Sequence, residues 1–275
     1  MKPILYFFPG AGPLGDVAAT LGRLCPEVEV VGITYPEWQN LTDSERAMDH
    51  VLEGAERQVR AKASSGPVLI VGYSLGAQIG WGFAHGFQRA GGTVAFFGAI
   101  NGRVATTDKP RRRWLRRAVR DFASDLLRGD IRAVAAFISS RFSRLLQRAA
   151  GSDLPKMAGR WARRGRLPWL LSRNPVFETE LNMRLLIRAA VPWTQRIESE
   201  LPPLDCPSLF VRGPDDEAFD GRWRSLCPRL DIRAVTSSHL AILQPPNFQE
   251  VVGLIKAAAR ESGTLAMAPA GDGTS

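Results

Sequence analysis

A serine flanked by glycines stands where a short apolar run gives way to a helical pattern. Residues 72–76 have the sequence GYSLG, the apolar run 67–71 precedes them, and a helix is predicted over 75–89. A turn from strand to helix with this pattern strains its serine and exposes the hydroxyl at the carboxyl end of a sheet. The N-terminus of the helix favours negative charge that develops there. The pattern therefore predicts that Ser74 is a nucleophile, against the alternative of an incidental serine in a glycine-rich turn.

A serine hydroxyl needs a base within hydrogen-bonding reach, and the chain contains three histidines. His50 lies in a predicted amphipathic helix, where a surface position explains it. His85 lies eleven residues after Ser74 in the same predicted helix. That spacing puts it about 16 Å along the helix axis, too far to reach the hydroxyl. His239 follows the last predicted strand in a small polar loop, so we predict that it is the general base.

A carboxylate behind the histidine would complete a triad. Residues 215 and 216, in the loop after the fifth predicted strand, are both aspartates. A carboxylate in such a loop can fix the histidine tautomer and stabilise the imidazolium ion. Asp216, which stands three residues after Gly213, is the preferred acid, and Asp215 is the alternative. Aspartate also favours turns, so a structural role for both stays open.

Two backbone N–H groups are needed to hold the negative charge that appears on a substrate carbonyl oxygen. One is predicted to be that of Leu75, directly after the nucleophile. The other is predicted to be that of Ala11, in the turn Gly10-Ala11-Gly12 after the first strand. The glycines of that turn would let the backbone approach a substrate closely. The alternative for Ala11 is a plain turn at the end of a strand.

Alternating strands and helices would position these groups. Strands are predicted at 4–8, 28–33, 67–71, 93–97, 207–211 and 231–235, and helices at 43–63, 75–89 and 246–260. This alternation predicts an α/β fold with a mostly parallel sheet flanked by helices. The length of 275 residues, with 45% hydrophobic and 23% charged residues, fits such a fold in an ordinary globular protein.

A long helical stretch interrupts this alternation between the fourth and fifth strands. It contains no convincing strand, and four prolines are expected to break it into short helices: Pro155, Pro168, Pro175 and Pro192. We therefore predict a helical, Arg-rich lid insertion over residues 103–203, in an α/β core formed by 1–102 and 204–262. The small and polar residues 263–275 are predicted to be a disordered tail.

In these features the chain resembles the thioesterases of non-ribosomal peptide and polyketide synthesis, in their free-standing form. Residues 8–12, FPGAG, are similar to the oxyanion loop of that family, and residues 72–77, GYSLGA, to its nucleophile turn. The helical insertion takes the position of that family's lid, and Ser238-His239 takes that of its histidine. The resemblance implies an α/β-hydrolase fold with a large helical lid.

The chain departs from the synthase-embedded members of this family at the strand after the nucleophile helix. Those enzymes usually carry their acid at the end of that strand, where this chain has GAIN at residues 98–101 and no carboxylate. Free-standing editing thioesterases use the later loop, where this chain has Asp215 and Asp216. The resemblance therefore implies the free-standing type, and it leaves a weakened or lost triad open.

The resemblance also implies an activity. This is hydrolysis of acyl or peptidyl thioesters, carried on the phosphopantetheine arm of a carrier protein or on coenzyme A, through an acyl-enzyme on Ser74. Two alternatives stay open. One is an esterase or lipase with the same serine nucleophile, and the other is an acyl-transferring or non-catalytic relative that binds a carrier protein.

The net charge of +9 comes from one segment. Residues 109–173 contain 18 Lys and Arg residues and four acidic residues, while the rest of the chain sums to −5. This segment would suit an acidic carrier protein with its phosphorylated arm, and Trp114 and Trp161 among the arginines would equally suit an anionic membrane surface. A plain solvated surface is the third interpretation. Nucleic acid binding is not expected, because no recognition motif accompanies the arginines.

The three cysteines have no metal-site spacing. Cys25, Cys206 and Cys227 predict neither a disulfide framework nor a zinc site, and they favour a reducing compartment. No stretch reaches the ~18 apolar residues of a membrane span, and the apolar run at the N-terminus is shorter than an export signal needs. A cytoplasmic location is therefore expected, with no cofactor and no metal.

Overall fold

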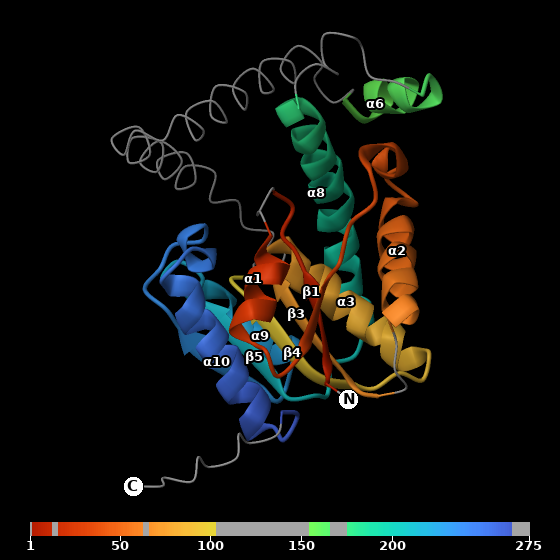
Figure 1. The fold of residues 1–275 in the computed structure, drawn as a ribbon. Helices are drawn as coiled ribbons and strands as arrows, with labels where there is room; N and C mark the ends of the chain where they lie inside the picture. The colour runs from red at the N-terminus through yellow and green to blue at the C-terminus, as the bar shows by residue number, and fades with distance from the viewer. Residues whose placement is uncertain (1, 13–15, 63–65, 103–153, 166–174, 266–275) are drawn as a thin grey trace, which may run out of the picture. The chain divides into compact units, whose positions relative to one another are not determined.

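The computed structural model describes residues 2–12, 16–62, 66–102, 154–165 and 175–265 (Figure 1). The chain forms two compact units. The first contains Met1–Tyr35, Val51–Val104 and Ala190–Ser275, and the second contains Pro36–His50 and Ala105–Ala189. Most of the basic segment of the sequence, with Pro168, lies outside the described residues, and so do residues 266–275 of the expected tail.

A parallel sheet forms the centre of the first unit. The described residues give it six strands, in the order β2-β1-β3-β4-β5-β6, and every neighbouring pair is parallel. The strands are β1 (Ile4–Phe8), β2 (Glu29–Gly32), β3 (Val68–Tyr73), β4 (Val94–Ile100), β5 (Ser208–Arg212) and β6 (Leu230–Ala234). Every residue of β1 and β3 is buried, as expected of strands covered on both faces. The predicted α/β fold is confirmed.

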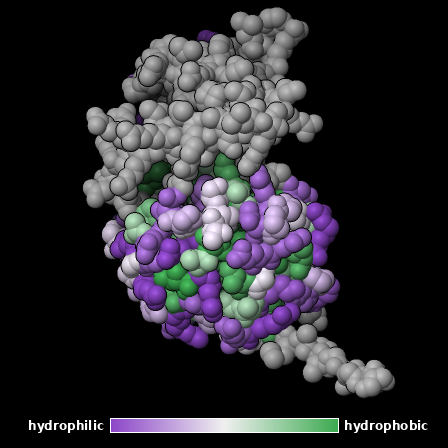
Figure 2. Space-filling model, turned by 90° about the vertical axis from the view of Figure 1, so that its left-hand side faces the viewer, coloured by the Kyte–Doolittle hydropathy of each residue, from purple (hydrophilic) through white to green (hydrophobic). Residues whose placement is uncertain are grey.

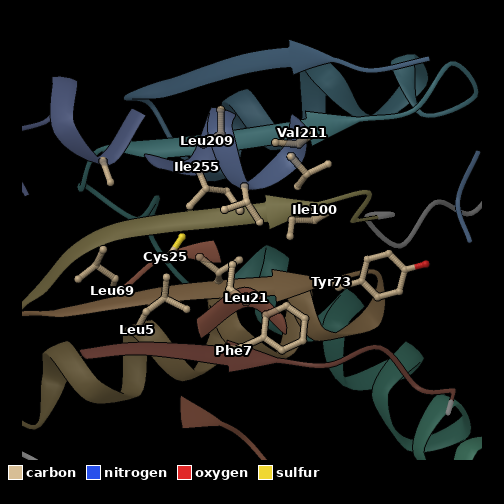
Figure 3. Close-up of a cluster of buried hydrophobic side chains, with 14 of the residues drawn as sticks. Leu5, Phe7, Leu21, Cys25, Leu69, Tyr73, Ile100, Leu209, Val211 and Ile255 are labelled. Atoms are coloured by element: carbon tan, nitrogen blue, oxygen red, sulfur yellow. The ribbon is translucent and has the colours of Figure 1, made fainter. Parts of the chain in front are cut away.

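One face of this sheet is covered by α1 (Val17–Leu24) and α10 (Asn247–Glu261). Side chains of these helices join alternate residues of the strands in one apolar cluster, which includes Phe7, Leu21 and Ile255 (Figure 3). Helix α1 is absent from the sequence prediction. Its start is marked by Asp16, whose carboxylate accepts a 2.9 Å hydrogen bond from the Ala19 N–H in the manner of an N-cap.

The other face of the sheet is covered by α3 (Leu75–Arg89) and α9 (Asp220–Leu226). The ring of Phe8 in β1 lies 5.2 Å from that of Phe83 in α3. The fully buried Trp223 of α9 packs beside Phe97 and Phe210, with ring centroids 5.8 and 5.7 Å apart. Two short 3-10 helices complete the loops of this unit, η3 (Glu217–Phe219) and η4 (Ala241–Leu243).

Two helices contain residues of both units, α2 (Ala47–Lys62) and α8 (Pro175–Glu200). The predicted break at Pro192 is wrong, because this proline lies inside the 26-residue helix α8. A proline in a helix interior removes one backbone hydrogen bond, which packing can offset. Here the next residue, Trp193, packs so tightly on α3 that a Cβ on Gly82 would lie 2.5 Å from its ring. Pro155 and Pro175 occupy first-turn positions of α6 and α8, where proline is tolerated.

The second unit contains η1 (Trp38–Leu41) and α6 (Leu154–Arg163), besides parts of α2 and α8. The indole N–H of Trp38 donates a 3.0 Å hydrogen bond to Glu178 Oε1, and the rings of Trp161 and Phe177 meet edge-on at 6.3 Å. Four basic side chains are exposed on α6 and the turn that follows it: Lys156, Arg160, Arg163 and Arg164. The predicted borders of the insertion stay a prediction.

The last described residues after α10 return to the sheet. Thr264 Oγ1 donates to the Ala95 carbonyl oxygen at 3.2 Å, and Leu265 is buried in the apolar cluster. On the face shown in Figure 2, hydrophilic side chains surround smaller hydrophobic areas of the described surface. Among the helices that the structure describes, none combines the length and the apolar character that a membrane span requires.

Candidate active site

Ser74 lies at the turn between β3 and α3. Its backbone has φ 54° and ψ −122°, a left-handed conformation that costs a non-glycine residue free energy and is typical of functional turns. The flanking glycines are required by close backbone contacts. A Cβ on Gly72 would lie 2.3 Å from the Gly76 carbonyl oxygen, and a Cβ on Gly76 would lie 2.1 Å from that of Phe8. The strand, turn and helix expected around Ser74 are therefore present.

The turn after β1 lies beside this serine. A Cβ on Gly76 would lie 2.1 Å from the Phe8 carbonyl oxygen and 2.3 Å from the Pro9 carbonyl oxygen. A Cβ on Gly10 would lie 3.4 Å from the Ser74 Cβ. The hydroxyl of Tyr35 donates a 2.8 Å hydrogen bond to the Pro9 carbonyl oxygen, and burial raises the pKa of that hydroxyl. Tyr35 therefore stays a protonated donor that fixes the turn.

The two proposed oxyanion donors come from these two neighbouring segments. Ala11 follows Gly10 in the turn after β1, and Leu75 is the first residue of α3. Both residues are partly buried. The structure thus brings the two backbone segments together around Ser74, while the oxyanion role of their N–H groups stays a prediction.

His239 is held against the residue that precedes Ser74. It lies in the loop between β6 and η4 and is partly buried. The hydroxyl of Tyr73 donates a 2.6 Å hydrogen bond to the His239 carbonyl oxygen, and the two rings stack with centroids 5.2 Å apart and planes at 30°. The loop after the last strand is therefore fixed at the carboxyl end of β3, next to Ser74.

Asn101 makes a contact with this histidine that the sequence did not predict. It directly follows β4, has φ 50° and is fully buried. Its Nδ2 lies 2.8 Å from His239 Nδ1, and its Oδ1 accepts a 3.3 Å hydrogen bond from the Gly213 N–H. Its position at the end of the strand next to β3 could have indicated this contact. The sequence prediction considered only carboxylates as partners of the histidine, and Asn101 carries an amide.

The two candidate acids differ in their surroundings. Asp216 is 2% exposed, whereas Asp215 is exposed. A Cβ on Gly213 would lie 3.7 Å from Asp216 Oδ2, 3.5 Å from Asn101 Oδ1 and 3.0 Å from the Ser237 carbonyl oxygen. The structure therefore brings Asp216 to the point where the β5 loop meets the amide of Asn101 and the histidine loop. Both aspartates make further interactions.

The remaining histidines and cysteines lie elsewhere. His85 is buried inside α3 and packs edge-on against Trp81, with ring centroids 4.6 Å apart. Burial, with a smaller contribution from Arg89, lowers its pKa. The three cysteines are buried free thiols. No group of three potential metal ligands gathers within the part of the chain that the structure describes.

Known structures share this fold at low sequence identity. RedJ, a thioesterase from the prodiginine biosynthetic pathway in Streptomyces coelicolor, is 18% identical with a TM-score of 0.58, covering 94% of this chain and 86% of that one. The NocB thioesterase domain from the nocardicin cluster is 16% identical with a TM-score of 0.57, covering 94% and 95%. The Vlm2 thioesterase domain is 16% identical with a TM-score of 0.55, covering 93% of each chain.

The family is shown by the sequence itself. A model of the thioesterase domain matches residues 3–146, which is more than half of the 275 residues. The matched range contains both the turn after β1 and the turn that carries Ser74. The chain belongs to the thioesterase domain family.

Proposed function

We propose that this protein is a serine thioesterase in which Ser74 is the nucleophile, His239 the general base and Asp216 the acid. The observation that carries the proposal is the strained turn at Ser74, φ 54°, beside a histidine loop that Tyr73 anchors with a 2.6 Å hydrogen bond. A nucleophile and a base brought together in this way are the basis of covalent catalysis. Asp216 is preferred to Asp215 because it is buried beside the histidine loop.

The reaction would proceed in two balanced steps. Ser74 Oγ attacks the thioester carbonyl carbon while His239 Nε2 takes the hydroxyl proton, and the N–H groups of Ala11 and Leu75 hold the oxyanion. The carbon–sulfur bond then breaks, and the thiol leaves with the proton from His239. In the second step His239 removes a proton from water, whose oxygen attacks the ester carbonyl carbon on Ser74. The bond between that carbon and Ser74 Oγ then breaks, His239 returns the proton to Ser74 Oγ, and the carboxylic acid leaves.

For the substrate, we propose an acyl or peptidyl thioester on the phosphopantetheine arm of a carrier protein. One of the similar structures comes from the prodiginine biosynthetic pathway, and another comes from the nocardicin cluster. The exposed Arg160 of α6, Arg164 in the turn after it, and the charge of +14 over residues 109–173 support an anionic partner. Oppositely charged surfaces speed the encounter of two proteins.

The test measures thiol release from three substrates that carry the same acyl group. These are an acyl carrier protein, the acyl-pantetheine and a simple ester, each with the wild type and with Ser74→Ala. We expect Ser74-dependent release, with the carrier substrate preferred over acyl-pantetheine in kcat/KM. Equal rates on carrier and pantetheine would refute the carrier as the partner. Release from the ester alone would indicate an esterase, and binding of the carrier without any release would indicate a non-catalytic relative.

The basic residues of α6 and of the turn after it provide a second arm of this test. Arg160→Glu combined with Arg164→Glu reverses charge at two exposed positions. We expect kcat/KM for the carrier substrate to fall, by about tenfold at low salt, because steering depends on charge. The same variant should hydrolyse acyl-pantetheine at the wild-type rate. An anionic vesicle that stimulates ester cleavage would point to a lipid surface instead.

A further inference from the structure

The turn that carries the proposed Ala11 donor is held by a tyrosine from the segment after β2. The hydroxyl of Tyr35 donates a 2.8 Å hydrogen bond to the Pro9 carbonyl oxygen. Because a peptide unit is planar, holding this oxygen fixes the whole unit that joins Pro9 to Gly10. The N–H group of Ala11 belongs to the next peptide unit along the turn. Its direction therefore depends on how the unit before it is held.

The same turn packs closely against the turn that carries Ser74. A Cβ on Gly76 would lie 2.3 Å from the Pro9 carbonyl oxygen, and a Cβ on Gly10 would lie 3.4 Å from the Ser74 Cβ. The turn also contains two glycines, and the backbone of glycine has more conformational freedom than that of other residues. A turn of this composition needs outside contacts to keep one conformation, and the Tyr35 hydroxyl provides such a contact.

Tyr35 is itself held on two sides by the fold. The residue before it, Thr34, donates its backbone N–H to Gln58 Oε1 at 2.9 Å, and Gln58 Nε2 donates to the Thr34 carbonyl oxygen at 2.9 Å. The Ile33 N–H donates to the Phe7 carbonyl oxygen at 2.8 Å. The segment that carries Tyr35 is thus fixed to α2 and to β1, within the first unit. Burial raises the pKa of the Tyr35 hydroxyl, so it donates throughout the neutral pH range.

We propose that Tyr35 is a positioning residue for the oxyanion: by holding the Pro9 carbonyl oxygen, it keeps the Ala11 N–H directed at the carbonyl oxygen of a substrate attacked by Ser74. This inference rests on the proposed function of Ser74 and Ala11. A donor to an oxyanion acts on charge that develops only in the transition state, and it must be oriented in advance. The effect of Tyr35 should therefore be found in kcat and not in the binding of the ground state.

Tyr35→Phe provides the kinetic test, with acyl-pantetheine as the substrate. Removing an oxyanion donor outright costs roughly 10²- to 10³-fold in kcat. A donor that is only held less well should cost less, so we expect kcat to fall about tenfold with KM changed by less than about twofold. Tyr6→Phe is the matched control, because Tyr6 lies in β1, which leads into the turn, and donates to the Val59 carbonyl oxygen at 3.2 Å. An unchanged kcat in Tyr35→Phe, or an equal fall in Tyr6→Phe, would overturn the proposal.

A tetrahedral adduct separates positioning of the oxyanion from a general loosening of the site. A trifluoromethyl ketone with the acyl chain of the substrate forms a bond between its carbonyl carbon and Ser74 Oγ. The serine proton goes to His239, and the ketone oxygen becomes an oxyanion. The corresponding thioether has no carbonyl group and forms no adduct. We expect Tyr35→Phe to raise the Kd of the ketone by about the same tenfold factor as kcat falls, and to leave the Kd of the thioether unchanged. An equal rise in both Kd values would indicate a purely structural role and overturn the proposal.

Gln58→Met is the second variant, for the case that Tyr35→Phe does not fold. Methionine has a similar length and cannot make the two hydrogen bonds that hold the Thr34 backbone, while the Tyr35 hydroxyl is kept. We expect a smaller fall in kcat, about threefold, with the Kd of the ketone raised by the same factor and that of the thioether unchanged. A fall in kcat without a change in the Kd of the ketone would contradict the proposal.

The backbone amide signal of Ala11 gives a readout that needs no substrate. In nitrogen-15 spectra of the full-length protein, this signal should shift in Tyr35→Phe and in Gln58→Met, and it should keep its wild-type position in Tyr6→Phe. An Ala11 signal that stays unchanged in Tyr35→Phe would overturn the proposal. Ser74→Ala that turned over like the wild type would instead refute the proposed function and leave the result for the amide intact.

Discussion

The hydroxyl of Tyr73 donates a 2.6 Å hydrogen bond to the carbonyl oxygen of His239, 166 residues further along the chain. Tyr73 also stacks on the histidine ring and directly precedes Ser74. One side chain therefore couples the turn that presents the proposed nucleophile to the loop that presents the proposed base. Catalysis of this kind depends on fixed geometry between these two groups.

Tyr73→Phe should weaken this coupling. The lost hydrogen bond contributes about 1 kcal/mol, so we expect kcat to fall by about five- to tenfold while the fold is kept. Tyr6→Phe is the matched control, because the buried Tyr6 donates a 3.2 Å hydrogen bond to the Val59 carbonyl oxygen away from the site. Both variants should lose similar stability in urea unfolding, and only Tyr73→Phe should lose activity. Equal activities would contradict a positioning role for Tyr73.

Asp216→Asn should separate the two candidate acids. We expect kcat to fall by roughly 10³- to 10⁴-fold, the effect of replacing a triad carboxylate by an amide. Asp215→Asn changes the neighbouring, exposed aspartate and should alter kcat by less than about twofold, as for other surface substitutions. The measurement is steady-state thiol release from acyl-pantetheine. The reverse ranking would assign the acid to Asp215.

Gly76→Ala should disrupt the close contact between α3 and the turn after β1. The new Cβ would lie 2.1 Å from the Phe8 carbonyl oxygen, and the shift this requires should cost about 3 kcal/mol or more. Gly86→Ala is the control on the same helix, since its Cβ would meet nothing within 4 Å. That variant should gain about 0.5–1 kcal/mol. Urea unfolding midpoints measure both, and a tolerated Gly76→Ala would contradict the close packing.

His85 should make stability depend on pH. Burial and, to a smaller extent, Arg89 lower the pKa of this histidine in the folded state, so the unfolded chain binds the proton more readily. The stabilisation is fully present above the unfolded pKa of about 6.5 and is lost as pH falls below it, by up to about 1.4 kcal/mol per pH unit. His85→Gln should remove this part of the dependence between pH 7.5 and 5.5 in urea unfolding. If the free energy of unfolding of His85→Gln changed between pH 7.5 and pH 5.5 as much as that of the wild type, the contribution assigned to His85 would be contradicted.

The sequence was most informative about the strands and about the turn at Ser74. Ile4–Phe8 is a continuous apolar run that stops before Pro9-Gly10, as predicted. The predicted strand 67–71 overlaps Val68–Tyr73, which extends two residues further, into the GYSLG turn. The burial of both strands follows from their apolar pattern. The elimination of His85 as the base also agrees with its position inside α3. The eight-residue helix α1 was missed because its apolar pattern is short, with buried Val17 and Leu21 as its main signal.

The contact between Asn101 and His239 could not be predicted because it depends on strand order. Ile100 pairs with Tyr73 on one side and with Val211 on the other, and this places the next residue, Asn101, between the Ser74 turn and the Gly213 loop. Spacing along the chain does not give neighbours in a sheet. Likewise, Pro192 was expected to break the helix because a proline removes a backbone hydrogen bond there. The helix continues through Pro192, and the packing of Trp193 on α3 offsets the lost hydrogen bond.

A cysteine nucleophile is the competing source of a covalent acyl-enzyme. Burial raises the pKa of Cys25 and of Cys206 to about 11, and that of Cys227 to about 12. Thiols with such pKa values are neutral and unreactive at neutral pH, because the thiolate is the attacking species. We therefore expect iodoacetamide to leave the activity of the native protein unchanged. Rapid inactivation would place a reactive thiol at the site.

The most direct test of Ser74 is to trap the acyl-enzyme. The protein is mixed with excess acyl-pantetheine, quenched with acid within one turnover, digested and analysed by mass spectrometry. We expect a burst of about one equivalent of thiol and an acyl group on the peptide that carries Ser74, with both absent in Ser74→Ala. Thiol release by Ser74→Ala at the wild-type rate, or an acyl group on any other residue, would contradict the proposed mechanism.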